Sequence, residues 1–193
     1  DGYFILPYTI QNYLADQIQV PRFDTNRPEF DEAEKGAEEH ISKLMNIKGK
    51  YPVDYFHKKL GHIMWEYVGM SRNAEGLKFA LKEIKALKKE FWTDVRIPGT
   101  DETVNPELEK ALRLADFFEI GELIALDALS REESCGGHFR TEYQTPDGEA
   151  LRNDEKFAFV SCWEYQGEDK EPILHKEPLN YQFVVPQQRN YKS

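Results

Sequence analysis

Hydrophobic residues recur with helical spacing along the middle of the chain. From Pro52 to about Met70 they follow the i, i+4, i+7, i+8 stripe of an amphipathic helix, at Phe56, Leu60, Ile63, Met64, Tyr67 and Val68. A second stripe runs to about Val95, with Leu77, Ala80, Leu81, Ile84, Leu87 and Phe91 facing inward. The two stripes are separated by a few residues only. This short connection predicts that the two helices are antiparallel neighbours.

A third helix is predicted from Pro106 to about Leu129. Asn105 is a preferred N-cap residue, Pro106 suits the first helical position, and Glu107 places an acid in the first turn. The apolar residues of this helix are too many for one stripe: Leu112, Leu114, Ala115, Phe117, Phe118, Ile120, Leu123, Ile124 and Leu126. We therefore expect this helix to be covered on two sides.

The segments on either side have a different character. A short helix is predicted from Phe4 to about Ile18, and Pro28 opens another helix after a loop over residues 19–27. After Arg131 the chain is rich in Gly, Pro, Asn and Asp. These residues predict turns, and two strands are predicted between and beyond them, at residues 157–163 and 181–185. Because this tail has few regular elements for its length, we expect it to wrap over another surface.

These patterns together predict a mainly α fold. Residues 1–50 would form two preceding helices, and residues 51–130 an antiparallel, spectrin-repeat-like three-helix bundle. Residues 131–193 would form a loop-rich C-terminal tail that contains a few short strands.

Composition and charge narrow the range of partners. The 193 residues carry a formal net charge of −10, which argues against nucleic acid because phosphate binding needs a basic surface. No apolar run approaches the ~20 residues that span a bilayer. Two cysteines, Cys135 and Cys162, are too few for a disulfide scaffold, so a reducing, cytosolic environment is expected. The amino terminus, Asp1-Gly2, has no initiator Met and no basic region of a signal peptide, and we expect it to lie inside a longer protein.

Familiar catalytic and cofactor motifs are missing from the sequence. It has no G-x-G-x-x-G or G-K-[ST] phosphate loop and no G-x-S-x-G nucleophile elbow. His57 and His62 are five residues apart on one predicted helix, and that spacing turns them too far around the helix to share a metal ion. The sequence therefore assigns no catalytic, cofactor-binding or metal-binding residue.

The most unusual stretch is residues 131–140, Arg-Glu-Glu-Ser-Cys-Gly-Gly-His-Phe-Arg. One interpretation is a nucleophilic site built from Cys135 and His138, although no third group that would orient the histidine is evident. The other is the end of a helix followed by a glycine in the left-handed conformation, with polar side chains fixing the loop. Both interpretations remain open at this point.

The same stretch carries a resemblance to a known family. Residues 131–143 (REESCGGHFRTEY) and 148–154 (GEALRND) resemble the late motif of flavoprotein subunits of succinate dehydrogenases and fumarate reductases. Residues 2–10, 56–61 with Met64-Trp65, 174–178 and 188–191 agree with it, so the resemblance spans essentially the whole chain. Many family members have Arg where Cys135 stands, and the version with Cys-Gly-Gly-His resembles the branch found with di-haem cytochrome b anchors.

The resemblance implies an oxidoreductase as the parent protein. In this family FAD exchanges a hydride between succinate and fumarate, and electrons pass through an iron–sulfur subunit and a cytochrome b membrane anchor to quinone. The family's flavin-binding and catalytic residues precede the region present here. The resemblance therefore implies that the parent is an enzyme, that these 193 residues alone are not, and that they bind no cofactor.

It also implies a structural role and a location. Residues 4–18 resemble the last helix of the flavin-binding domain, and residues 52–129 resemble the family's three-helix bundle. The chain would then buttress the flavin-binding and capping domains of its own subunit. Our hypothesis is that Glu133, His138, Arg140 and Arg152 are the structural anchors. The parent would be cytoplasmic, peripheral on the cytoplasmic face of the inner membrane through its partner subunits.

A second hypothesis belongs to a different functional class. A free-standing acidic helical bundle could serve protein–protein interaction or assembly, with the first helix as its docking element. In either case the first helix and the tail lack a surface to pack on, so we expect self-association of the isolated chain.

Overall fold

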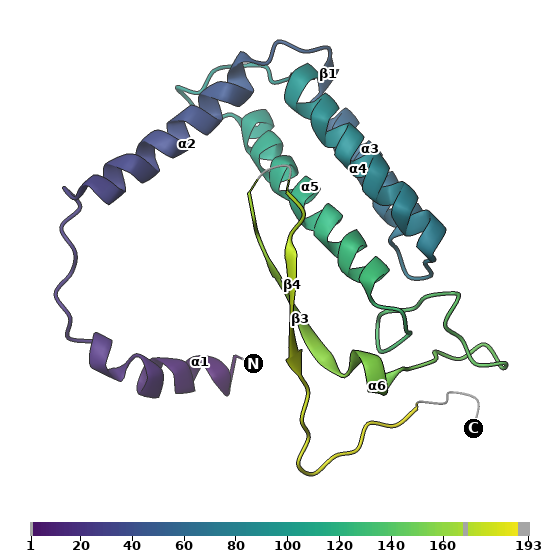
Figure 1. Ribbon diagram of the computed structural model, residues 1–193. Helices are drawn as coiled ribbons and strands as arrows, with labels where there is room; N and C mark the ends of the chain where they lie inside the picture. Colours follow the sequence, from purple (N-terminus) through teal and green to yellow (C-terminus); the bar gives the residue numbers. More distant parts are fainter. Residues whose placement is uncertain (1, 168–169, 189–193) are drawn as a thin grey trace. The chain divides into compact units, whose positions relative to one another are not determined.

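A computed structural model describes residues 2–167 and 170–188 of the chain (Figure 1). The described chain is mainly helical, with a few short strands, as the sequence predicts. It divides into two units, residues 1–40 and residues 41–193. No helix in the described residues is long and apolar enough to cross a membrane.

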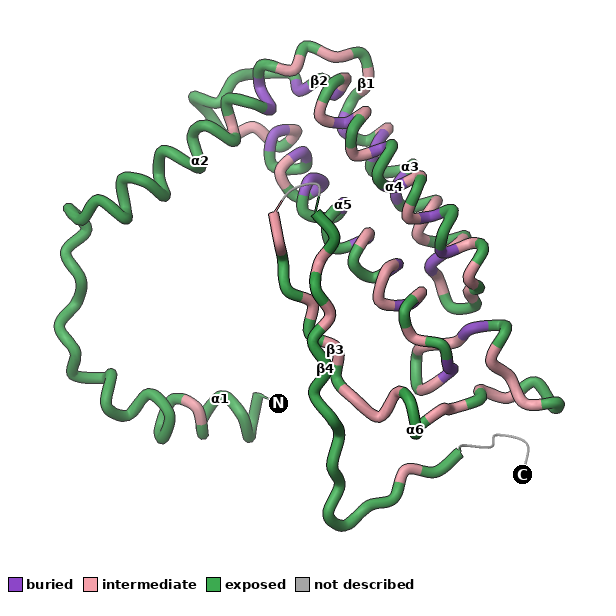
Figure 2. Tube along the Cα trace, viewed as in Figure 1, coloured by how far each residue is buried: buried purple, intermediate pink, exposed green. Residues whose placement is uncertain are grey.

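The first unit consists of short helical segments without a core. α1 (Ile5–Tyr8) is followed by a π-helical segment, η1 (Thr9–Tyr13), and by a 3-10 segment, η2 (Ala15–Gln17). The helix predicted over residues 4–18 is therefore helical, but it is not one continuous α-helix. None of residues 2–40 is buried, as Figure 2 shows, and a short helix without a packing surface is marginal. α2 (Pro28–Asn46) begins at the predicted proline.

The second unit is built around three long helices. α3 (Val53–Tyr67), α4 (Ala74–Asp94) and α5 (Pro106–Ser130) lie close to their predicted bounds. Phe56, Phe91 and Phe118, one from each helix, meet in the core with ring centroids 5.5 Å apart in both successive pairs. Edge-to-face and tilted contacts of this kind add to the free energy gained by burial.

Part of the apolar surface of α5 is exposed in the described structure. Its buried positions are Leu108, Ala111, Leu114, Ala115, Phe118, Gly121, Ala125 and Ala128. Phe117, Ile120 and Ile124 are exposed, and so is Leu123. α3 and α4 pack on the buried side of α5, and the cover expected on its other side stays a prediction.

The helix starts are fixed by asparagine side chains. Asn73 accepts a hydrogen bond from the Gly76 amide at 2.8 Å, at the start of α4. Asn105 accepts from the Glu107 and Leu108 amides at 3.1 and 3.2 Å, which confirms the predicted N-cap of α5. These bonds satisfy amides that have no partner inside a helix.

A two-residue parallel pairing joins the chain on either side of α3 and α4. β1 (Tyr51–Pro52) pairs with β2 (Val95–Arg96), and the Gly49 amide donates to the Val95 carbonyl at 3.1 Å. A Cβ atom at Gly49 would come within 1.9 Å of the Asp94 carbonyl carbon. This approach of two backbone segments therefore requires glycine.

The tail adds a short helix and one hairpin. α6 (Asp154–Phe157) precedes β3 (Phe159–Glu164), which pairs antiparallel with β4 (Ile173–Pro178) in the register Phe159↔Pro178. β3 corresponds to the strand predicted at residues 157–163. The strand predicted at residues 181–185 is wrong, because β3 pairs instead with the more polar segment at β4. Residues 189–191 of the resemblance lie outside the described residues.

Candidate functional site

The buried polar residues of the described chain gather just after the end of α5. They are Glu133, Ser134 and Arg140, with exposed fractions of 3%, 0% and 2%. Charged side chains are buried only where they are paired and hydrogen-bonded. Two of the four predicted anchors, Glu133 and Arg140, are among them.

Arg140 contacts the end of α5. Its Nη1 donates to the carbonyls of Ala128 and Leu129 at 3.0 and 3.2 Å. These carbonyls belong to the last turn, where a helix has unpaired acceptors and a partial negative charge. Arg140 therefore caps α5 with both a hydrogen-bond donor and a positive charge.

Glu142 extends this contact to a second helix. Arg140 donates from Nε and Nη2 to the two carboxylate oxygens of Glu142, at 3.1 and 3.2 Å. The same carboxylate accepts a hydrogen bond from the Ala74 amide, in the first turn of α4. A negative charge is favourable at a helix N-terminus. The Arg140–Glu142 pair thus joins the end of α5 to the start of α4.

The Glu142 carboxyl titrates far below its ordinary range. Partial burial raises its pKa, but the hydrogen bonds from the Arg140 side chain and the Ala74 amide outweigh burial and lower the pKa to about 2. The carboxylate therefore stays charged well into acid.

Arg131 and Glu133 connect α5 to the tail. Arg131 donates from Nη1 to Glu133 Oε1 and from Nη1 and Nη2 to the carbonyls of Phe157 and Phe159, each at 3.0 Å. The second Glu133 oxygen accepts from the Asn153 amide at 2.8 Å. The planar guanidinium thus holds the start of β3 against the helix end, with geometry that an ammonium group would not reproduce.

His138 lies in a tight turn beside Arg131. The Cys135 and His138 backbones exchange hydrogen bonds of 2.8 and 3.0 Å, and Gly136 between them has φ +59°. His138 Nε2 is 2.9 Å from the Arg131 carbonyl. Burial lowers the pKa of His138 most, and the nearby Arg72 and Arg140 charges lower it further, although the Arg131 carbonyl opposes this. In its neutral form the ring donates a hydrogen bond from Nε2 to the Arg131 carbonyl, just after the end of α5.

The thiol–imidazole contact of a nucleophilic site is not seen here. Among the described residues, no hydrogen bond joins the Cys135 sulfur to His138, and the left-handed glycine of the alternative interpretation is present. The geometry favours the interpretation in which polar side chains fix the loop.

Arg152 lies at the edge of this group. Its guanidinium pairs with Asp154 Oδ1, with Nη2 at 2.6 Å and Nε at 3.2 Å, and its amide donates to Gln188 Oε1 at 3.3 Å. Glu133 and His138 therefore share Arg131 as a partner, Arg140 contacts the last turn of α5, and Arg152 interacts with Glu133 through its charge alone.

Sequence reasoning missed three residues of the network: Arg131, Ser134 and Glu142. Ser134 Oγ accepts from the Arg140 amide at 2.9 Å and donates to its carbonyl at 3.1 Å. All three stand inside the resembling stretch. Their roles could not be found from spacing, because the decisive partners, such as Phe159 for Arg131 and Ala74 for Glu142, are distant in sequence.

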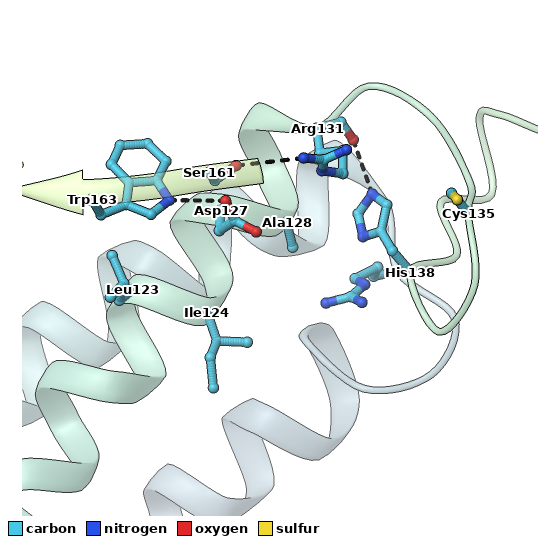
Figure 3. A pocket seen from close by; sticks show the side chains of 10 residues that line it. Leu123, Ile124, Asp127, Ala128, Arg131, Cys135, His138, Ser161 and Trp163 are labelled. Carbon is cyan, nitrogen blue, oxygen red and sulfur yellow. Dashed lines mark hydrogen bonds between the residues drawn. The ribbon is translucent and has the colours of Figure 1, made fainter. Parts of the chain in front are cut away.

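A cleft of about 540 Å³ opens beside the network (Figure 3). It is lined by Arg72, Leu123, Ile124, Asp127, Ala128, Arg131, Cys135, His138, Ser161 and Trp163. The Trp163 indole donates to Asp127 Oδ1 at 2.8 Å, which ties β3 to α5 along one wall. No group of three or more acidic, histidine or cysteine side chains that could hold a metal ion occurs in the part of the chain that the structure describes.

Known proteins resemble this chain in sequence and in fold. Residues 57–191 match the family described as fumarate reductase flavoprotein C-term. The fumarate reductase flavoprotein subunit of Helicobacter pylori is 26% identical over 168 residues, which are 87% of this chain and 23% of that protein. The succinate dehydrogenase flavoprotein subunit of Bacillus subtilis is 24% identical over 162 residues, which are 84% of this chain and 26% of that protein.

A solved quinol-fumarate reductase with menaquinol molecules has a similar fold. Its TM-score is 0.71 at 22% identity, over 86% of this chain and 28% of that one. The chain thus spans about a quarter of the length of the relatives it matches. The family match covers more than half of the chain and includes the whole polar network. This chain belongs to the fumarate reductase flavoprotein C-terminal family.

Proposed function

We propose that this chain is the C-terminal structural region of the flavoprotein subunit of a succinate dehydrogenase or fumarate reductase. The family match over residues 57–191 carries the proposal. The network after α5 supports it, because its buried charges are used to join helices and tail to one another.

The redox chemistry of such a subunit would belong to residues outside this chain. In the parent, FAD would accept a hydride from succinate or return it to fumarate, with electrons passing through an iron–sulfur subunit and a cytochrome b anchor to quinone. The chain offers no glycine-rich loop for the phosphates of a dinucleotide, so its residues do not fit the flavin. We expect the 193 residues alone to bind no flavin and to have no dehydrogenase activity.

The proposed role of this chain is to support the flavin-binding and capping domains of the same subunit. Residues 51–130 would form an antiparallel bundle of the spectrin-repeat kind, residues 1–50 would precede it, and residues 131–193 would return over the enzyme body. Glu133, His138 and Arg140 would anchor this tail to the bundle, with Arg152 as an outer anchor. The contacts of Arg140 with the last turn of α5 support this assignment.

The exposed apolar residues indicate where the rest of the subunit would bind. Tyr3, Phe4 and Tyr8 in the first unit are exposed, and so is the second side of α5, including Ile120. Apolar surface of this kind is typical of interaction sites. We propose that the flavin-binding and capping domains cover it, and that the subunit is peripheral on the cytoplasmic face of the inner membrane through its partner subunits.

Flavin retention by the full-length subunit tests the proposal. A subunit that ends before Arg131 should lose its flavin, measured as flavin absorbance per subunit after gel filtration. Arg131→Lys in the full-length subunit keeps the charge but not the planar fork, and should lower flavin content in part. Arg113→Lys is the matched control, because Arg113 pairs with Glu109 on the helix surface. Flavin content unchanged by the truncation would reject the proposal.

A free-standing interaction module is the second candidate. The exposed first unit favours it, because an unpacked helical segment can dock on another protein. The reading frame separates the two candidates. A long coding region upstream with a glycine-rich strand–helix motif supports the enzyme subunit, and a start codon beside Asp1 supports the module.

A further inference from the structure

The cleft beside the network has the chemistry of an anion site. Its charged lining residues are Arg72, Arg131 and Asp127, two guanidinium groups against one carboxylate. Burial lowers the pKa of His138, which disfavours a positive charge on this ring. Leu123 and Ile124 form an apolar wall (Figure 3). Because Arg131 is paired with Glu133 at 3.0 Å, the lining offers the Arg72 guanidinium next to a surface for a carbon skeleton.

The guanidinium groups of Arg131 and Arg72 differ in how many of their N–H donors have an acceptor. Arg131 already donates to Glu133, to two backbone carbonyls and, at 3.5 Å, to Ser161. Within residues 2–167 and 170–188, the hydrogen bond of the Arg72 side chain is a long one, from Nη1 to the Val68 carbonyl at 3.5 Å. Its Nε is buried and has no acceptor among the described residues. A buried donor without an acceptor is destabilising, so the Arg72 Nε–H is the donor that an added acceptor would satisfy.

Arg72 is also held in place. Its amide donates to the Phe139 carbonyl at 3.3 Å, and its carbonyl accepts from the Thr141 amide at 2.9 Å. Burial lowers the pKa of Arg72, and the nearby Arg140 charge lowers it further, although Asp127 opposes this. The positive charge of Arg72 is therefore only partly compensated by its surroundings. A bound anion would stabilise this charge.

We propose that this cleft binds a carboxylate group, with the Arg72 guanidinium as its principal partner. A carboxylate matches the flat, forked donors of a guanidinium, and the apolar wall suits the carbon atoms that carry it. The carboxylate can belong to a small organic acid or to an acidic side chain of another polypeptide segment. This inference goes beyond the structural role proposed above, and it can be tested without flavin.

Nuclear magnetic resonance of the 15N-labelled chain tests the site directly. The probes are sodium acetate and the blocked peptide acetyl-Gly-Glu-Gly-amide, each compared with sodium chloride at the same ionic strength. We expect the Arg72 Nε–H signal, and the Trp163 indole N–H signal across the cleft, to shift to saturation with a carboxylate and not with chloride. Saturation by acetate alone indicates a small acid as the source, and saturation by the peptide indicates an acidic side chain.

Two variants check the role of Arg72. Arg72→Lys keeps the charge and loses the fork, and should weaken carboxylate binding at least tenfold, followed at the Trp163 signal. Arg113→Lys, on the surface of α5, should bind as the unchanged chain does. The proposal is overturned if carboxylates and chloride give the same unsaturated shifts in the unchanged chain, a result that needs no variant to fold. It is also overturned if both variants bind as the unchanged chain does.

Discussion

Arg140 and Glu142 lie two residues apart in the loop after α5, yet each stabilises a different helix. Arg140 caps the last turn of α5, and Glu142 accepts from the first turn of α4. Since each residue also compensates the charge of the other, removing either one leaves the other without its ion-pair partner.

The low pKa of Glu142 predicts a specific loss of stability in acid. A group whose pKa is lowered by folding stabilises the folded state above its unfolded pKa, near 4.5, and loses this effect as pH falls through about 2. Because more than a third of the side chain is exposed, solvent screening reduces the contribution to about 1 kcal/mol.

We therefore expect Glu142→Gln to lower the free energy of unfolding by about 1 kcal/mol at pH 7 and by much less near pH 2. Urea unfolding followed by circular dichroism at both pH values measures this. Glu102→Gln, in the exposed loop before α5, is the control. A Glu142→Gln effect that is equally large at both pH values would contradict the argument.

The candidate site was only partly predictable from single residues. The sequence indicates that residues 131–140 are unusual, and the structure buries Glu133 and Arg140 there and places His138 Nε2 2.9 Å from the Arg131 carbonyl. Arg131 and Glu142 could not be identified, since their roles depend on the carbonyl of Phe159 and the amide of Ala74, which only the folded chain brings near. Arg152 has the expected residue type, but its contacts are with Asp154 and Gln188.

At the scale of elements, local sequence determines where the long helices begin. Asn105 caps α5 and also donates from its side-chain amide to the carbonyls of Pro98 and Thr100, at 2.9 and 3.0 Å. One side chain therefore fixes both the helix start and the loop that leads to it.

Two substitutions at Asn105 separate these effects. Asn105→Ala removes both and should lower the free energy of unfolding by about 1–2 kcal/mol. Asn105→Asp keeps the capping acceptor and loses the two donated bonds, so its cost should be smaller. Thermal and urea unfolding of the three proteins measure the order. An Asp variant less stable than the Ala variant would show that the cap is not the main contribution.

Replacing Gly49 or Gly36 with Ala is expected to change the free energy of unfolding in opposite directions. A methyl group at Gly49 collides with the Asp94 backbone, so Gly49→Ala should cost on the order of 2 kcal/mol. Gly36 lies inside α2 with open space around it, so Gly36→Ala should stabilise that helix by roughly 0.5–1 kcal/mol. Urea unfolding and helical circular dichroism measure both. A neutral Gly49→Ala would contradict the close approach.

The elements that sequence failed to predict depend on distant partners. The segment at β4 has little alternation, and it is a strand because its backbone pairs with β3 from Phe159 to Glu164. Residues 181–185 alternate as a strand does, but no described strand pairs with them. Part of the apolar surface of α5, including Phe117 and Ile120, is exposed, and the cover that its pattern predicts stays a prediction.

At the scale of the whole molecule, a large amount of apolar surface is exposed. In the first unit it includes Tyr3, Phe4, Tyr13 and Phe23. Exposed apolar patches associate with whatever surface is available. In the isolated chain, the available surface is a second copy.

We therefore expect the isolated chain to self-associate as its concentration rises, measured as weight-average mass by sedimentation equilibrium. Replacing Phe4 and Tyr8 with Gln should weaken this association, because both side chains are exposed in the first unit. Replacing Lys35 and Glu39 with Gln, a surface ion pair on α2, is the control and should have little effect. A constant monomer mass over a wide concentration range would contradict this expectation.

The position of Arg140 and Glu142 along the polypeptide has a consequence for synthesis. Both residues follow α4 and α5 in the chain, so they leave the ribosome after the helices whose ends they satisfy. A nascent chain that stops short of residue 140 contains α3, α4 and α5 in full but lacks the charged side chains that bind at the end of α5 and the start of α4. Since domains fold progressively as they emerge, the contacts that join the end of α5 to the start of α4 can form only after the loop beyond these helices has been translated.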